Sequence, residues 1–208
     1  MAKSFFLVED HSLMRQGIVT YLAKNSEFTC AGVAASPQEF LIAMSEGGAS
    51  CQPDVLITDL NLEGSMNDGI QLIQTCRRKF PALKIVVYSM YAAASVVSTA
   101  MNSGADAYIS KLSNEEELVI ALKRVVAGQT YIDSAISSQM VDYERKLSIF
   151  TRRELEILNF ILMGNSNSVI SETLDVSKRS VENYISRIYD KTGFSSKDEL
   201  IAHFGRID

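Results

Sequence analysis

Short apolar runs alternate with helical patterns along residues 1–128, and this alternation limits the possible folds more than any other feature. Between the first two runs, apolar residues recur at helical spacing, as at Met14, Ile18 and Leu22. Strands that alternate with helices favour a parallel sheet with helices on both faces. We therefore expect an α/β domain with a doubly wound five-stranded parallel sheet. The expected strands are Phe5–Val8, Phe28–Ala34, Val55–Thr58, Lys84–Tyr88 and Ala107–Ile109.

A different pattern follows and predicts a second, all-α domain. Thr151-Arg-Arg-Glu154 and Ser196-Lys-Asp-Glu199 are capping boxes, in which a hydroxyl and a carboxylate can each bond an amide of the first turn. Two further helices between them make four, with no strand. We predict a first domain at 1–128, a linker with some helix at 129–147, and a four-helix domain at 148–208. The four expected helices are 151–163, Ser168–Leu174, Lys178–Lys191 and 196–204.

Composition places the chain among soluble proteins. Of 208 residues, 47% are hydrophobic and 22% charged, and the N-terminus lacks the apolar run of a signal peptide. The uncharged stretch Ile85–Ala105 contains too many polar residues for a membrane span. Cys30, Cys51 and Cys76 have no metal-ligand or redox spacing, and an odd count suggests reduced thiols. We expect a cytoplasmic protein without membrane contact. The net charge of −5 gives no general sign of nucleic-acid binding.

Polar side chains follow four of the five expected strands. Glu9 and Asp10 follow the first, Asp59 the third, Ser89 the fourth and Lys111 the fifth. The carboxyl ends of parallel strands lie along one edge of the sheet, and ligands bind there where the strand order reverses. For the order 2-1-3-4-5 that point lies between the first and third strands, so these side chains should converge on one crevice.

The chemistry of this set points to phosphoryl transfer. Clustered carboxylates repel one another unless a cation joins them, and hard oxygen ligands suit Mg²⁺. Lys111 would supply a positive charge for a phosphoryl group, and Ser89 a hydrogen bond. Phosphoryl transfer needs mainly positioning and charge neutralisation, which these groups can provide.

The strand motifs resemble those of the receiver domain of two-component response regulators, with its fold and strand order 2-1-3-4-5. The four motifs read "FFLVEDH", "VLITDL", "VVYSMY" and "GADAYISK". The intervals from Asp59 to Ser89, from Ser89 to Lys111 and from Tyr108 to Lys111 match the family pattern. The resemblance implies that Asp59 is the nucleophile that becomes an aspartyl phosphate.

The resemblance also implies roles for the neighbouring residues. Asp10, Asp59 and the backbone carbonyl of Asn61 would hold Mg²⁺, with Glu9 beside them as a second carboxylate. The resemblance gives further roles to Lys111, Ser89 and Tyr108.

Lys111 and Ser89 would bind the phosphoryl oxygens, and Tyr108 would swing inward as Ser89 moves. Phosphorylation would thus be a local change of charge that shifts the balance between two conformations of this switch. The simpler alternative for Tyr108 is an ordinary half-buried aromatic of a strand.

Residues 148–204 resemble the LuxR-type helix-turn-helix domain of the NarL/FixJ subfamily. The segment Lys178–Lys191 would be the recognition helix, which lies in the major groove. Periodicity alone predicts a core stripe along it and an opposite face that is free to read DNA. The stripe is Val181, Tyr184, Ile185, Ile188 and Tyr189. The expected DNA-binding residues are Lys178, Arg179, Glu182, Asn183, Ser186, Arg187 and Lys191.

This helix is less basic than its relatives. Family members often carry Lys where Glu182 stands, His where Tyr184 stands, a basic residue at Ser168 and glycine at Asp175. Since each phosphate that is neutralised adds salt-dependent affinity, we expect weak binding by a monomer, rescued by a homodimer on paired half-sites. Alternatively, the face is merely solvated and the domain serves protein interaction.

Three functions are compatible with these patterns. The first is a transcription factor that a sensor histidine kinase phosphorylates on Asp59, which then dimerises and binds double-stranded promoter DNA. The second is an auxiliary regulator that acts through heterodimers and contacts DNA poorly, as the acidic Glu182 suggests. The third, a phosphate-transferring or hydrolysing enzyme, leaves the helical domain unexplained. We therefore do not expect an enzyme.

The loop after Asp59 departs from the family. Glu63 stands where a proline is usual, and Gly69 lies two residues further on than the family's closing glycine. We expect this loop to slow phosphorylation by small donors or to alter kinase docking.

Overall fold

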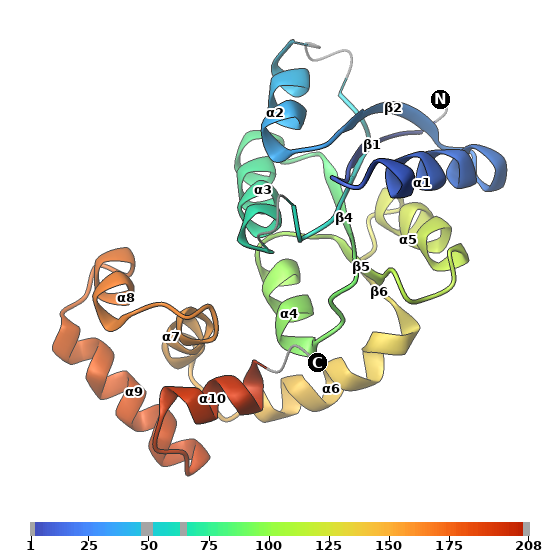
Figure 1. The fold of residues 1–208 in the computed structure, drawn as a ribbon. Coiled ribbons are helices and arrows are strands. Elements are labelled where there is room, and N and C mark those ends of the chain that lie inside the picture. Colours follow the sequence, from blue (N-terminus) through green and yellow to red (C-terminus); the bar gives the residue numbers. More distant parts are fainter. Residues whose placement is uncertain (1–2, 47–51, 63–65, 206–208) are drawn as a thin grey trace. The chain divides into compact units, whose positions relative to one another are not determined.

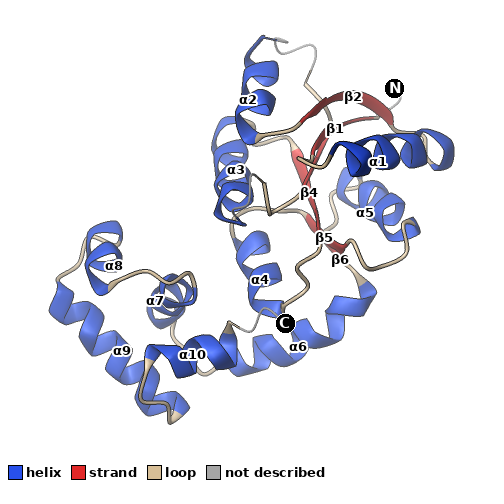
Figure 2. Cartoon of the chain, viewed as in Figure 1, coloured by secondary structure: helices blue, strands red, loops and turns tan. Residues whose placement is uncertain are grey.

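The chain forms two compact units in the computed structural model, which describes residues 3–46, 52–62 and 66–205. Residues 1–92 and 97–137 make up the first unit, and residues 93–96 and 138–208 the second. Figure 1 follows the chain by colour through both units, and Figure 2 shows that the strands belong to the first. Among the described residues, none of the helices has the length and hydrophobicity of a membrane-spanning segment.

A single parallel sheet forms the centre of the first unit. Its strands are ordered β2-β1-β3-β4-β5-β6, which confirms the predicted order and adds a short sixth strand beside β5 (Figure 1). The sixth strand lies in the segment 129–147 that was predicted as a linker. The strands are β1 Ser4–Val8, β2 Thr29–Ala34, β3 Val55–Thr58, β4 Lys84–Ser89, β5 Ala107–Ser110 and β6 Tyr131–Ile132.

Helices cover both faces of this sheet, because alternate residues of each strand point to opposite sides. Phe5 belongs to a core that includes Leu22 of α1 and Leu122 of α5. Its neighbour Phe6 packs edge-on against Phe40 of α2, with ring centroids 5.0 Å apart. The helices of this unit are α1 Ser12–Asn25, α2 Pro37–Glu46, α3 Met66–Lys79, α4 Ala94–Asn102 and α5 Glu116–Val126, of which α4 begins in the second unit.

Gly69 lies in the first turn of α3, just after the loop that follows β3. Its amide donates to the carbonyl of Leu60 at 3.2 Å. A Cβ atom at this position would lie 2.5 Å from the backbone of Leu60, so only glycine fits this close approach without a shift. Glu63, the predicted substitute for proline, lies outside the described residues.

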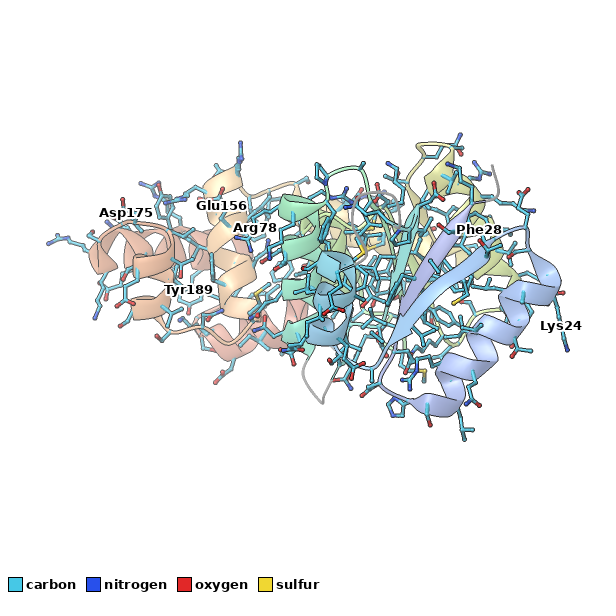
Figure 3. All side chains as sticks on the ribbon, turned by 90° about the horizontal axis from the view of Figure 1, so that it is seen from above. Lys24, Phe28, Arg78, Glu156, Asp175 and Tyr189 are labelled. Carbon is cyan, nitrogen blue, oxygen red and sulfur yellow. The ribbon has the colours of Figure 1, made fainter. Side chains whose placement is uncertain are left out.

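The second unit consists of helices whose ends follow the predicted caps. Both capping boxes, at Thr151 and Ser196, are present with reciprocal side-chain and backbone bonds. Asp175, labelled in Figure 3, takes the left-handed backbone conformation with φ of 50° between two helices, where the family usually has glycine. The helices are α6 Ser134–Leu147, α7 Arg152–Leu162, α8 Asn167–Thr173, α9 Lys178–Thr192 and α10 Lys197–Phe204, and the first turn of α6 still belongs to the first unit.

Candidate functional site

Lys111 lies between two buried carboxylates at the carboxyl edge of the sheet. Its Nζ atom is 2.6 Å from Oε2 of Glu9 and 2.6 Å from Oδ2 of Asp59. The lysine side chain is 4% exposed, and those of the two acids are 1% and 6% exposed. Strands β1 and β3 are direct neighbours, which brings the two acids together from positions 50 residues apart in the sequence.

The backbone fixes the orientation of the Asp59 carboxylate. Its Oδ1 atom accepts hydrogen bonds from the amides of Leu60 at 2.6 Å and Asn61 at 3.3 Å. The Asp59 amide donates to the carbonyl of Val8 at 3.1 Å, which ties the end of β3 to β1. One carboxylate oxygen is therefore held by amides, and the other faces Lys111.

Opposing effects act on the lysine. Burial lowers the pKa of Lys111, but the Asp59 and Glu9 carboxylates raise it more, so that the pKa lies above its ordinary value. The ammonium group is therefore charged at neutral pH. It compensates two carboxylates that would otherwise repel each other.

Asp10 points to a different partner. Its Oδ1 atom lies 2.7 Å from Nδ1 of His11, and the same nitrogen is 3.2 Å from Oε1 of Glu9. These acids raise the pKa of the exposed His11, chiefly through the charge of Asp10. Arg15 donates to the backbone carbonyls of Glu9 and Asp10. Neither His11 nor Arg15 was predicted from the sequence, although His11 directly follows the acid pair.

A pocket opens over this edge and includes most of the predicted residues. Ser89 lines it, and its buried hydroxyl has no hydrogen-bond partner among the described residues. Tyr108 is fully buried rather than half-buried, and its hydroxyl donates to the backbone carbonyl of Tyr91. Burial raises the pKa of Tyr108, so the phenol stays protonated. The pocket is lined by Glu9, His11, Met14, Asp59, Asn61, Ser89, Met90, Tyr91 and Lys111.

Helix α9 presents its predicted polar face to solvent. Val181, Ile185 and Ile188 are buried, but Tyr184 and Tyr189 are only partly buried, so the core stripe is narrower than expected. The seven predicted DNA-binding residues, Lys178, Arg179, Glu182, Asn183, Ser186, Arg187 and Lys191, are all exposed.

Two of the basic residues already have partners. The guanidinium carbon of Arg187 lies 5.5 Å from the ring centroid of Tyr184, which orients this side chain along the helix. Lys191 donates to the Glu154 carboxylate at 2.6 Å and to the carbonyl of Ile149 at 2.9 Å. Lys191 therefore stabilises the start of α7. Its ammonium group is less available to bind a phosphate than those of the other basic residues.

Fold and site together define a doubly wound α/β unit with an acidic, lysine-bridged edge, followed by a helix-turn-helix unit. Residues 5–123 match the family described as response regulator receiver domain, and residues 148–204 match the bacterial regulatory proteins of the luxR family. The chain therefore belongs to the response regulators that carry a LuxR-type domain, as the motifs predicted.

Individual relatives agree with this assignment. The chain is 26% identical to the transcriptional regulatory protein DegU of Brevibacillus brevis, over 94% of the chain and 89% of that protein. It is 28% identical to the oxygen regulatory protein NreC of Staphylococcus aureus strain MRSA252, over 95% and 94%.

Solved structures show the same fold. A structure of two RcsB dimers bound to two parallel DNAs has a TM-score of 0.67 at 20% identity and covers 100% of both chains. A structure of RcsB from Salmonella typhimurium has a TM-score of 0.65 at 21% identity and covers 99% of each.

Proposed function

We propose that a sensor histidine kinase phosphorylates Asp59 and that this controls promoter binding by the helix-turn-helix unit. The convergence of Glu9, Asp59 and Lys111 at one edge supports this proposal most directly. In the transfer, a carboxylate oxygen of Asp59 bonds to phosphorus as the phosphorus–nitrogen bond of a phosphohistidine breaks, and the imidazole leaves. The reaction needs no further nucleophile, because the carboxylate itself attacks.

Two groups of the pocket would bind the incoming phosphoryl oxygens. Lys111 already touches the attacking carboxylate, so a small rotation of its ammonium group can follow the charge as it moves to the phosphoryl group. The buried Ser89 hydroxyl lines the pocket and can donate to another oxygen. The phosphoryl group would thus supply a strong acceptor for Ser89.

The donor set also fits Mg²⁺. Glu9, Asp10 and Asp59 are carboxylates that belong to neighbouring strand ends, and the backbone carbonyl of Asn61 would complete the set. When bound, the ion would neutralise negative charge during phosphoryl transfer. Asp10 would have to exchange its His11 partner for the ion, and Lys111 would give up part of its contact with Glu9.

Tyr108 is the proposed link between the phosphoryl group and the outer face, by which we mean the face formed by β4, β5, α4 and α5. Its hydroxyl lies inside the unit and donates to the backbone carbonyl of Tyr91. Tyr91 lies in the loop that begins directly after Ser89, the last residue of β4. Movement of Ser89 toward a phosphoryl oxygen would change this loop. We propose that the altered face controls assembly into a homodimer.

In a homodimer, the exposed polar face of α9 in each copy would read one of two paired half-sites on DNA. Asn183 can pair with adenine and Glu182 can accept from cytosine, while Lys178, Arg179 and Arg187 suit phosphates. The output is regulation, so we assign no enzymatic class, and we place the protein in the cytoplasm with its kinase and DNA.

A second function is motivated by one exposed charge. Glu182 stands in the middle of the reading face, where it would repel phosphates. An auxiliary regulator that forms heterodimers and contacts DNA poorly would tolerate this charge. Footprinting with purified protein separates the two, since no protection at any promoter, with or without phosphorylation, would favour the auxiliary role.

The central test compares wild type with Asp59→Asn by genomic footprinting. We expect occupancy of promoter sites to depend on Asp59, and labelling by acetyl phosphate to disappear in the variant. Equal occupancy of the same sites by both proteins would refute the phosphorylation switch. For the loop, labelling of wild type as fast as that of a shortened, proline-restored variant would contradict slowed phosphorylation.

A further inference from the structure

Asp133 is a fully buried acid outside the phosphoryl site. It stands between β6 and α6, the helix whose residues 134–137 belong to the first unit and 138–147 to the second. A buried carboxylate is costly unless hydrogen bonds compensate it, so its contacts indicate what it holds in place.

The carboxylate of Asp133 joins a strand to a helix. Its Oδ2 atom accepts a hydrogen bond from the amide of Ser110 at 3.2 Å, and its Oδ1 atom accepts one from the amide of Ala135 at 2.7 Å. The first bond reaches the last residue of β5, and the second caps the first turn of α6. The two oxygens of one side chain thus connect these two elements.

The backbone of Asp133 adds a third connection to the same strand. Its amide donates to the carbonyl of Tyr108 at 3.0 Å. The main chain and the side chain of Asp133 therefore hydrogen-bond to β5 on both sides of Ile109. One of the two bonded residues is the proposed switch Tyr108, and the other, Ser110, directly precedes Lys111.

The Lys111 side of this connection is also fixed. The amide of Lys111 donates to the carbonyl of Ser89 at 2.8 Å, and its side chain reaches Glu9 and Asp59. The end of β5 thus contacts β4 through the amide of Lys111 and contacts Asp133 through the amide of Ser110. A shift of the Lys111 ammonium toward a phosphoryl oxygen would act on this strand end.

A second contact keeps β6 in place. Tyr131 pairs with Ala107 of β5, and its hydroxyl donates to Glu117 of α5 at 2.5 Å. The hydroxyl of Ser134 donates to the same carboxylate at 3.3 Å. The start of α6 is therefore bound both to the edge strand β6 and to α5.

We propose that Asp133 is a positioning residue that couples the phosphoryl site to α6, by holding the end of β5 and the first turn of α6 with one carboxylate. The coupling rests on the proposed phosphorylation of Asp59. It assigns the input of α6 to the end of β5, while Glu117 of α5 holds the same turn of α6.

Two substitutions separate capping from coupling. Asp133→Ser keeps a short oxygen that can cap α6 but cannot also reach Ser110, whereas Asp133→Ala removes both bonds. Asp142→Ser, at a side chain of α6 that is 74% exposed, serves as the matched control. The full-length proteins are compared by amide hydrogen exchange, with and without Mg²⁺ and beryllofluoride, an analogue of the phosphoryl group.

In wild type and in the Asp142 variant, the analogue should change amide exchange both around Asp59 and along residues 138–147, by about fivefold or more. Asp133→Ser should keep the change around Asp59 and lose most of the change along 138–147. A helix that merely needed its cap would respond in this variant as in wild type, and that result would overturn the coupling.

The two proposals fail in different ways. An analogue that changes exchange around Asp59 of wild type but leaves 138–147 unchanged would overturn the coupling and leave phosphorylation standing. An analogue that changes neither region would refute the phosphoryl site and the coupling together. Asp133→Ala should lose the response along 138–147 and also exchange faster there without the analogue.

Discussion

Replacing Lys111 by methionine tests the electrostatic account of the site most directly. Methionine keeps most of the side-chain volume and removes the ammonium group. Two buried carboxylates, on Glu9 and Asp59, then face each other without compensation. The receiver unit should lose stability at neutral pH, and acid should restore part of it.

The magnitude follows from the two contacts. Each is a charge-assisted hydrogen bond of 2.6 Å, worth about 1.5–3 kcal/mol. Removing one partner of a buried ion pair costs about 3–5 kcal/mol, because a charge stays buried without compensation. We therefore expect Lys111→Met to lower the free energy of unfolding by about 3–5 kcal/mol at pH 7 without Mg²⁺.

The pH dependence has a definite sign. Without the ammonium group, the two carboxylates repel each other in the folded variant, and protonation of one of them relieves this repulsion. The folded variant then binds more protons than the unfolded chain, so its stability rises as the pH falls from 7 to 5. Lys111 has a raised pKa in wild type, so its own contribution is fully present throughout this range and fades only in strong alkali.

Amide exchange of β3 and β5 peptides in increasing urea measures this stability for the receiver unit alone. Lys84→Met is the control, since Lys84 pairs with Asp106 at 3.5 Å near the surface and should cost less than about 1 kcal/mol. A loss below about 1 kcal/mol in Lys111→Met, or an equal loss at pH 7 and pH 5, would refute the reasoning.

Further substitutions test the caps, the loop and the switch. Glu154→Gln should cost the helical unit about 1–2 kcal/mol at neutral pH, and progressively less as an acid titration followed by circular dichroism passes below the ordinary range of a glutamate. Burial raises the pKa of Glu154, but hydrogen bonds from Lys191 and Thr151 outweigh it and hold the pKa below its ordinary value, so the contribution of Glu154 is lost as acid protonates the folded-state carboxylate. Gly69→Ala should cost about 1–3 kcal/mol in urea unfolding because of its 2.5 Å clash, whereas Gly17→Ala, with open space, should be neutral or stabilising. Tyr108→Phe should lower receiver stability by about 1 kcal/mol, and unchanged exchange of β5 would contradict its hydrogen bond.

Much of the fold could be predicted because its signals are local. The two capping boxes depend on residues three positions apart, and the strand pattern depends on the burial of alternate side chains. The sixth strand could not be found in this way, since Tyr131–Ile132 is too short to show a period. It exists because β5 offers a free edge next to it.

The candidate site was predictable to the level of its strands. Parallel topology alone brings Glu9, Asp59 and Lys111 to one edge. It does not say which way each side chain turns, and Asp10 turns to His11 rather than to the lysine. Side-chain direction depends on neighbours from several elements, which no local pattern contains.

The sequence by itself determined the two units, the helix starts and the residues that share the acidic edge, because periodicity and capping act over a few positions. The order of the strands came from the resemblance to the receiver family. Only the tertiary structure decided that Lys111 bridges two acids, that Lys191 binds Glu154 from 37 residues away, and that Asp133 joins β5 to α6. Each of these depends on at least one hydrogen bond between segments far apart in the sequence, with a buried carboxylate as the acceptor. Such a contact forms only when packing has excluded water and left these groups no other partners.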